Sequence, residues 1–351
     1  MSLGTLFSTR QNNLNLLRLI AALCVIYGHA GAITGGGEPD VFLRLVGYKF
    51  IGGVAVDVFF VLSGFLIASS LCSGKGIIYY MISRVLRIFP ALLVCVLLTA
   101  MVLGPWLTVS DQYWTEATWN YVLHNGLAWK TEYFLPGVFS DLHDKAVNGS
   151  LWSLPVEVRL YVWALALYCL QLLRHRVLFN LVMIGLFALG IFKPSVYAPF
   201  LIHPSHLQTV GMFMIGMLCW VNRKSIPLHP LVFCAVLGVV AMAKGTAFFG
   251  YVYMVAVPYT VFCLAFVPGF GWFNRVGDFS YGAYLYGWPI QQLMMTADRS
   301  MSTAENAVLS CVAALVVGAI SWHMVEAPAL RLKHLFSRNP TAKFAPMEIS
   351  S

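Results

Sequence analysis

The stretch LRLIAALCVIYGH, residues 17–29, is an apolar segment with one strong base near each end. Arg18 and His29 are eleven residues apart, which is three helical turns, so their side chains lie on nearly one face of a helix. Ionisable groups inside an apolar span are costly and normally face a protein interior or a wet cavity. The segment therefore predicts a membrane helix that lines a buried polar space.

Two plainer interpretations of this segment stay open at this point. Ala30-Gly31-Ala32 also fits the small-residue cleavage pattern of a signal peptide, because a short apolar stretch precedes it, with Arg10 and Arg18 upstream. His29 could instead be an ordinary core histidine with no chemical role. The rest of the chain has to decide between these interpretations.

Composition places the chain in the membrane class. Of its 351 residues, 59% are hydrophobic and only 10% are charged, and the mean hydropathy is +0.76. Ten stretches are long and apolar enough to predict membrane spans. They lie near residues 15–33, 53–71, 88–108, 151–172, 177–195, 206–221, 230–245, 249–268, 279–296 and 305–325. We expect an all-α polytopic membrane protein with about ten transmembrane helices around a buried polar cavity.

The formal net charge of +8 follows the positive-inside rule and gives no reason to expect a nucleic-acid partner. With the N-terminus in the cytoplasm, fourteen of the 22 Lys and Arg residues fall in cytoplasmic segments and seven in outer ones. This asymmetry predicts that both termini are cytoplasmic. The eight cysteines have no metal-ligand spacing, and we expect neither a metal site nor a disulfide framework.

Residues 1–335 are predicted to form one transmembrane domain, and residues 336–351 a short cytoplasmic tail. The longest polar piece is an outer loop at about 109–150, rich in Trp and Tyr. Aromatic residues argue against disorder, so the loop either covers a functional site or floats at the lipid headgroups. It contains the sequon Asn148-Gly149-Ser150, a three-residue match that often arises by chance.

Charged and polar residues recur inside the apolar stretches. In the second stretch, Asp57 lies in the outer half of the membrane and needs a partner, Ser63 lies near mid-depth, and Gly64 favours close helix packing. In the fourth, Glu157 is predicted in the outer half of the bilayer, after a serine cap at Ser150 or Ser153. In the ninth, Gln291 offers hydrogen-bonding groups that would be wasted on lipid.

Arg84 and Arg87 are three residues apart and share one helical face at the cytoplasmic side. They could be ordinary positive-inside anchors. Two arginines at the mouth of a cavity would also suit a phosphate-bearing ligand, through charge-assisted hydrogen bonds.

Taken together, the motifs resemble acyltransferase family 3, the integral-membrane O-acyltransferases that modify surface sugars. The matching pieces follow one another in the family's order along almost the whole chain. They are the pair Arg18 and His29, VDVFFVLSGFLI at 56–67, RVLRIFPA at 84–91, SLWSLPVE at 150–157, FSYGAYLYGWP at 279–289 and EAPALRL at 326–332.

The resemblance implies an O-acetyltransferase that moves an acetyl group from cytoplasmic acetyl-CoA, or another acyl-CoA, to a carbohydrate hydroxyl. The acceptor would be a surface polysaccharide or a lipid-linked glycan, and the enzyme would lie in the bilayer of a bacterial inner membrane. One departure matters. Many relatives have His where this chain has Gly287, so no role of that imidazole can be carried over.

Attack of a sugar hydroxyl on a thioester requires removal of the hydroxyl proton and stabilisation of an oxyanion. We expect His29 to be the base, with a carboxylate to orient it, and Glu157 is preferred over Asp57 for this role. A covalent acyl-histidine relay across the membrane is the alternative mechanism. Arg18, Arg84 and Arg87 are expected to bind the donor, and the cavity or substrate residues are expected to be Ser63, Trp152, Ser153, Tyr281 and Gln291.

Two rival functions use the same buried charges. In a transporter or flippase they would form a proton relay or a substrate pathway, although the chain has no repeat symmetry. A noncatalytic subunit for polysaccharide assembly would transfer no acyl group at all.

Overall fold

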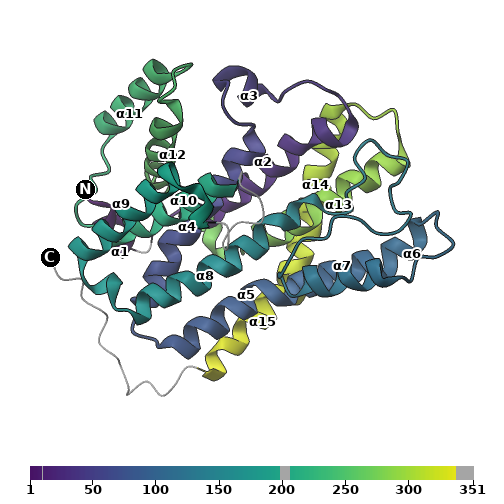
Figure 1. The fold of residues 1–351 in the computed structure, drawn as a ribbon, viewed down its shortest axis with the longest axis horizontal. Helices are drawn as coiled ribbons and strands as arrows, with labels where there is room; N and C mark the ends of the chain where they lie inside the picture. Colours follow the sequence, from purple (N-terminus) through teal and green to yellow (C-terminus); the bar gives the residue numbers. More distant parts are fainter. Residues whose placement is uncertain (10, 198–205, 337–351) are drawn as a thin grey trace.

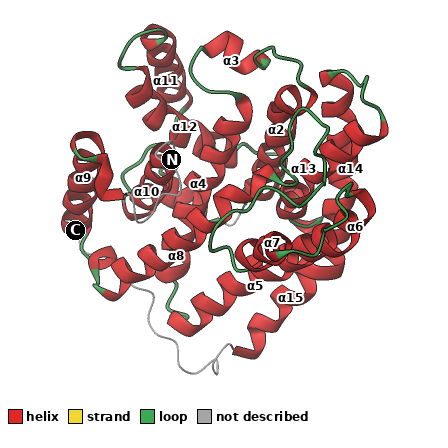
Figure 2. Cartoon of the chain, turned by 45° about the vertical axis from the view of Figure 1, so that its right-hand side comes forward, coloured by secondary structure: helices red, strands yellow, loops and turns green. Residues whose placement is uncertain are grey.

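The protein was analysed as a computed structural model, which describes residues 1–9, 11–197 and 206–336. The described residues form helices and their connections, and no β-strand occurs among them (Figures 1 and 2). The only strand-like pairing in this part of the chain is an isolated bridge between Ser2 and Pro227. The predicted all-α class is therefore confirmed.

A helix lies over each of the ten apolar stretches. Two of the helices are prolonged through a π-helical turn, Thr99–Leu103 after α5 and Trp322–Glu326 after α14. The helices over the stretches are α2 (Leu14–Thr34), α4 (Ile51–Leu71), α5 (Ile77–Leu98) with α6 (Gly104–Leu107), α8 (Ser153–Cys169), α9 (Arg176–Phe192), α10 (Leu207–Val221), α11 (Pro230–Ala243), α12 (Phe249–Ala265), α13 (Ser280–Ala297), and α14 (Thr303–Ser321) with α15 (Ala327–Arg331). The short helices are α1 (Leu3–Ser8), α3 (Val41–Val46) and α7 (Glu116–Gly126).

Four of these helical segments are long and apolar enough to cross a membrane, judged by length and composition. They are Leu14–Thr34, Ile51–Leu71, Ile77–Leu107 and Thr303–Phe336. Four shorter apolar helices accompany them, α9, α10, α11 and α12. The chain is thus a membrane protein, whereas the number of ten spans stays a prediction.

The core of the fold is the group α2, α4, α10, α13 and α14. Helix α4 packs between α2 and α10, and α2 in turn packs against α13 and α14. Gly64 and Gly216 allow α4 and α10 to approach closely, because a methyl group on Gly64 would overlap the carbonyl oxygen of Phe213 and one on Gly216 would overlap that of Val61. This contact confirms the close packing expected at Gly64.

The remaining helices surround this core. Helix α5 lies beside α7 and α15, and α11 and α12 form a pair at one edge of the molecule (Figures 1 and 2). Helix α5 begins at Ile77, about three turns before the stretch expected near residue 88. Arg84 and Arg87 therefore lie on a continuous helix, and both reach the same cavity, described below.

The segment at 109–150 is folded against the helices. Tyr113 and Tyr121 are buried in it, while Trp114, Trp119 and Trp129 are exposed. Asn148 of the sequon is fully buried, and its side-chain amide donates a hydrogen bond to the backbone carbonyl of Leu285. Asn148 is therefore a structural residue, which agrees with a chance sequon.

Candidate active site

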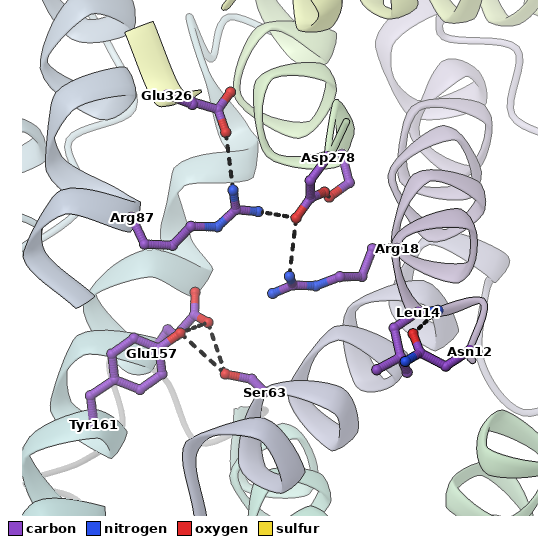
Figure 3. A network of polar contacts seen from close by, with 10 residues as sticks. Asn12, Leu14, Arg18, Ser63, Arg87, Glu157, Tyr161, Asp278 and Glu326 are labelled. Atoms are coloured by element: carbon purple, nitrogen blue, oxygen red, sulfur yellow. Dashed lines mark hydrogen bonds and ion pairs between the residues drawn. The ribbon is translucent and has the colours of Figure 1, made fainter. Parts of the chain in front are cut away.

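Three charged residues from distant parts of the sequence meet at one end of α2. Arg18 on α2 and Arg87 on α5 both donate a hydrogen bond to Asp278, which precedes α13. The nitrogen to oxygen distances are 3.2 Å from Arg18 and 2.6 Å from Arg87, to the same carboxylate oxygen. In Figure 3 the guanidinium of Arg87 approaches the Asp278 carboxylate from the left and that of Arg18 from below.

A second carboxylate, that of Glu326, joins these three charged residues. Glu326 accepts a hydrogen bond from Arg87 at 3.3 Å and another from the hydroxyl of Ser321 at 3.0 Å. It lies in the π-helical turn at the end of α14, a form that occurs often at functional sites. We use the name inner cluster for Arg18, Arg87, Asp278 and Glu326.

The ionised state of Asp278 is maintained by its arginine partners. Burial by itself would raise the pKa of this carboxyl, but Arg87 and Arg18 outweigh burial and hold the pKa below its usual value. Loss of one partner would leave an uncompensated buried charge, which typically costs about 3–5 kcal/mol. The inner cluster thus stabilises the fold through its ion pairs and also places charged groups along an adjoining cavity.

A basic cavity of about 490 Å³ opens beside the inner cluster. Five cationic side chains line it, whereas Asp278 is the only acidic residue along it in the part of the chain that the structure describes. The cationic residues are Arg18, Lys75, Arg84, Arg87 and Lys333. Arg84 packs against the ring of Tyr161, and its buried Nε has no hydrogen-bond partner in the part of the chain that the structure describes. The cavity is therefore suited to a ligand with several negative charges.

A smaller chamber of about 50 Å³ adjoins the basic cavity and shares Arg18, Arg87 and Tyr161 with it. Glu157 on α8 lines this chamber and accepts hydrogen bonds from Ser63 at 3.0 Å and from Tyr161 at 2.5 Å. Figure 3 shows Glu157 on the same side of the site as Arg87. Glu157 thus lies beside Ser63 and lines the same chamber as Arg18 and Arg87.

His29 lies farther along α2, against aromatic rings. Its Nδ1 is 2.7 Å from the backbone carbonyl of Val25, and its ring contacts Phe50 at 5.2 Å and Trp288 at 4.9 Å between centroids. A carbonyl oxygen only accepts, so Nδ1 must carry the proton of the neutral ring. The Nε2 atom is then left with a lone pair, as a general base requires.

The structure does not bring either expected carboxylate to His29. Asp57 is fully buried and accepts hydrogen bonds from Lys49 at 2.7 Å, Tyr253 at 2.7 Å and Thr209 at 3.3 Å. Asp57 was expected to need a partner, and that partner is Lys49. The hydroxyls of Tyr253 and Thr209 add two further hydrogen bonds. The hydrogen bonds of Glu157 described above likewise involve other residues.

The loop at 109–150, which carries Asp144, reaches the neighbourhood of His29 through α13. The backbone around Asp144 is held to α13, because Gln292 donates hydrogen bonds to the carbonyls of Asp144 and Ala146, both at 2.7 Å. Trp288, which contacts His29, also donates to Ala146. Asp144 was not among the residues expected near His29, since it lies in a loop far from His29 along the chain.

The expected cavity residues are divided among different places. Ser63 lines the basic cavity, while Ser153 and Tyr281 line the small chamber. Ser153 is hydrogen-bonded to the hydroxyl of Tyr284 and does not cap α8. The indole of Trp152 stacks on the imidazole of His206, with 4.1 Å between centroids.

Gln291 is buried within the helix core. Its amide donates to the carbonyl of Ile26 and to Asn306, so it ties α13 to α2 and α14. The position of Gly287 faces the same interface, where a Cβ atom would lie 2.6 Å from the side chain of Ile26. Ile26 therefore occupies the space that a larger side chain at 287 would need.

Comparison with known proteins gives an independent line of evidence. A family model described as an acyltransferase domain, acyltransferase 3, matches residues 11–323. An "O-acetyl transferase" of Shigella phage Sf6 is 26% identical over 329 residues, which cover 90% of this chain and 95% of the relative. "Nodulation protein 10" of Rhizobium leguminosarum bv. viciae is 32% identical over 161 residues, 44% of this chain and 43% of that protein. No solved structure matches the chain.

Proposed function

We propose, since this chain belongs to acyltransferase family 3, that it is a membrane O-acetyltransferase that moves an acetyl group from cytoplasmic acetyl-CoA to a carbohydrate hydroxyl. The O-acetyl transferase of the phage, similar over nearly its whole length, supports acetyl as the group transferred. The observation that carries the proposal is the basic cavity, lined by five cationic side chains, which adjoins a chamber containing Glu157.

The donor site is the basic cavity. Coenzyme A carries a diphosphate and a third phosphate on its ribose, and guanidinium groups bind such oxygens with two hydrogen bonds each. Arg84 has donors to spare, because its buried Nε has no hydrogen-bond partner among the described residues. Arg18 and Arg87 border both spaces, so they lie where the donor would pass from the basic cavity into the chamber.

His29 is the general base of the reaction. Its Nε2 takes the proton of the sugar hydroxyl while the sugar oxygen forms a bond to the thioester carbon. The oxyanion then collapses, the carbon to sulfur bond breaks, and the imidazolium returns the proton to the departing sulfur. Val25 supports this role, because its carbonyl fixes the tautomer in which Nε2 is unprotonated.

Glu157 belongs to the donor side of the reaction. Its carboxylate accepts hydrogen bonds from Ser63 and Tyr161 and lines the chamber that adjoins the basic cavity. We assign to it the positioning of the hydroxyl groups that face the thioester. Asp57 has a structural role, as the buried partner of Lys49.

Two routes connect the donor to the acceptor. In direct transfer, the sugar hydroxyl attacks the thioester. In the relay, His29 first takes the acyl group from the thioester with release of the CoA thiol, and then passes it to the sugar. The relay is supported by the position of His29, which packs on Trp288, one helical turn beyond the chamber residue Tyr284. Labelled acetyl-CoA without acceptor distinguishes the two, because only the relay leaves labelled protein.

The acceptor is proposed to be a surface polysaccharide or a lipid-linked glycan that reaches His29 from the outer side. Ser63, Ser153 and Tyr281 are assigned to the cavity, and Trp152 to its rim near His206. Gln291 acts by holding α13 against α2.

The topology follows the basic residues, with a bacterial inner membrane as the location, both termini in the cytoplasm and residues 1–335 as the catalytic domain. The end of the expected tail, residues 337–351, lies outside the described residues. Cysteine introduced at Lys224 should then react only from the cytoplasm, and cysteine at Asp111 only from outside. Labelling of both positions from one side would overturn this topology.

The experiment that tests the function is transfer of labelled acetyl from acetyl-CoA by the purified protein in vesicles, with polysaccharide from the source cells as acceptor. We expect a labelled ester on the carbohydrate. Accumulation of unmodified substrate inside the vesicles, without an ester, would favour a transporter. Neither product would favour a noncatalytic subunit.

A further inference from the structure

Two connected spaces of very different size lie along the donor path. The basic cavity measures about 490 Å³, and the chamber behind Arg18 and Arg87 measures about 50 Å³. In the function proposed above, the nucleotide of the donor occupies the basic cavity, and the chamber is an adjoining space that the thioester end of the pantetheine arm can enter. The size of the chamber then limits the acyl group that the site accepts.

A volume of this size holds only a few atoms. By the same kind of measure, one water molecule needs about 10–15 Å³, so the chamber has room for roughly three to five non-hydrogen atoms. An acetyl group has three, two carbons and one oxygen, and a butanoyl group has two more methylene carbons. With the thioester sulfur included, the acetyl end fits the chamber and the butanoyl end exceeds it.

The chamber walls away from the arginines are mainly apolar side chains. Helix α4 contributes Val56 and Phe60, which are buried, and Phe59, which is half-buried, and helix α8 contributes the buried Leu154. The ring of Phe59 contacts the ring of Tyr284 at 5.8 Å between centroids. A longer acyl chain would have to displace these side chains from a packed interior, which costs typically about 1–3 kcal/mol.

We propose that this chamber is the acyl pocket of the enzyme and that Phe59 is a specificity-determining residue, which favours a short acyl group such as acetyl over a four-carbon one. The inference rests on the proposed function, because it takes the basic cavity as the CoA site. It adds the pocket that receives the acyl group and the residue that limits its length.

The test measures binding of CoA, acetyl-CoA and butanoyl-CoA to the purified protein in detergent by titration calorimetry. One methylene group in a fitted apolar pocket is worth about 10- to 200-fold, so we expect the intact protein to bind acetyl-CoA at least about 10-fold more tightly than butanoyl-CoA. Phe59→Ala should abolish this preference, while its affinity for CoA itself stays within about 3-fold of that of the intact protein.

Phe65→Ala is the matched control, because Phe65 lies on the same helix but packs against Phe7, Trp220 and Phe262, away from both spaces. It should keep the preference for acetyl-CoA. The ratio of two affinities measured on one preparation does not depend on the fraction of protein that is folded.

Three outcomes would contradict the inference. Equal binding of acetyl-CoA and butanoyl-CoA by the intact protein, with CoA bound, would overturn the acyl pocket and leave the proposed function standing. An unchanged preference in Phe59→Ala would overturn the role of Phe59. Absence of binding by all three compounds would overturn both the acyl pocket and the proposed donor site.

Discussion

Arg87 donates a hydrogen bond of 2.6 Å to Asp278, and this contact joins two segments that are 191 residues apart in the sequence. The side chain of Arg87 is 13% exposed and that of Asp278 is 9% exposed, so the pair is largely withdrawn from solvent. Arg87 therefore links distant parts of the fold and also lines the basic cavity. Arg84, one turn earlier on α5, differs, because it lines the same cavity but forms no ion pair among the described residues.

This difference predicts separate effects of the two arginines. Arg84→Gln should weaken CoA binding about 10- to 150-fold, as expected for the loss of a charge-assisted hydrogen bond of about 1.5–3 kcal/mol, with little change in Tm. Arg87→Gln should lower the free energy of unfolding by about 3–5 kcal/mol, because Glu326 loses its ion-pair partner and Asp278 keeps only Arg18. Calorimetry with CoA and thermal unfolding in detergent measure the two quantities. Unchanged affinity in Arg84→Gln would make Arg84 an ordinary membrane anchor.

His29→Ala should fold and bind acetyl-CoA but lose acetyl transfer by about 10²–10⁴-fold, because removal of the hydroxyl proton then has no base. Binding should persist because His29 lies outside the residues that line the basic cavity. Two measurements on the same preparation check this: the rate of transfer of labelled acetyl, and the affinity for CoA by calorimetry. Transfer at a near-normal rate would rule out both the base and the relay, and His29 would be a packing residue.

Glu157→Gln should reduce acetyl transfer less than His29→Ala does. The amide keeps the shape of the carboxylate and one acceptor oxygen, so the hydroxyls of Ser63 and Tyr161 retain part of their orientation. Its effect should appear in kcat more than in CoA affinity, since Glu157 lines the chamber and not the basic cavity. A loss as large as that of His29→Ala, with unchanged CoA binding, would require a direct chemical role for Glu157.

Gly64→Ala should destabilise the protein by at least about 1–3 kcal/mol, because its methyl group would overlap the carbonyl oxygen of Phe213 and force α4 and α10 apart. Gly238→Ala on α11 is the matched control, since a Cβ atom there meets nothing within 4 Å. Thermal unfolding of the two variants in one detergent compares them. Equal Tm values would mean that the contact between the two helices adapts without cost.

Local patterns in the sequence were sufficient to predict where the helices lie. Apolar runs of membrane length gave a helix at each expected place, and the small side chain of Gly64 indicated close packing. Helix α5 extends about three turns before the apolar stretch expected near residue 88, because Arg84 and Arg87 interrupt the apolar run of a helix that continues through them. Periodicity reports the buried face of a helix and carries less information about its ends.

The pairs of residues that meet across the fold could not be predicted in the same way. Asp278 and Glu326 are the carboxylates that bind Arg18 and Arg87, yet nothing in their spacing along the chain links them to either arginine. Their signal was weaker: an acidic residue at the end of an apolar segment needs a buried partner. The π-helical turn that places Glu326 and the loop that places Asp144 near His29 depend on tertiary packing.

The central claim, that this protein adds acetyl esters to a carbohydrate, is tested most directly by mass spectrometry of surface polysaccharide from the source cells. Three strains are compared, one with the intact protein, one without it and one with His29→Ala. We predict that only the first carries an added mass of acetyl groups, and that mild alkali, which cleaves esters, removes it. Polysaccharides of identical mass from the first two strains would contradict the account.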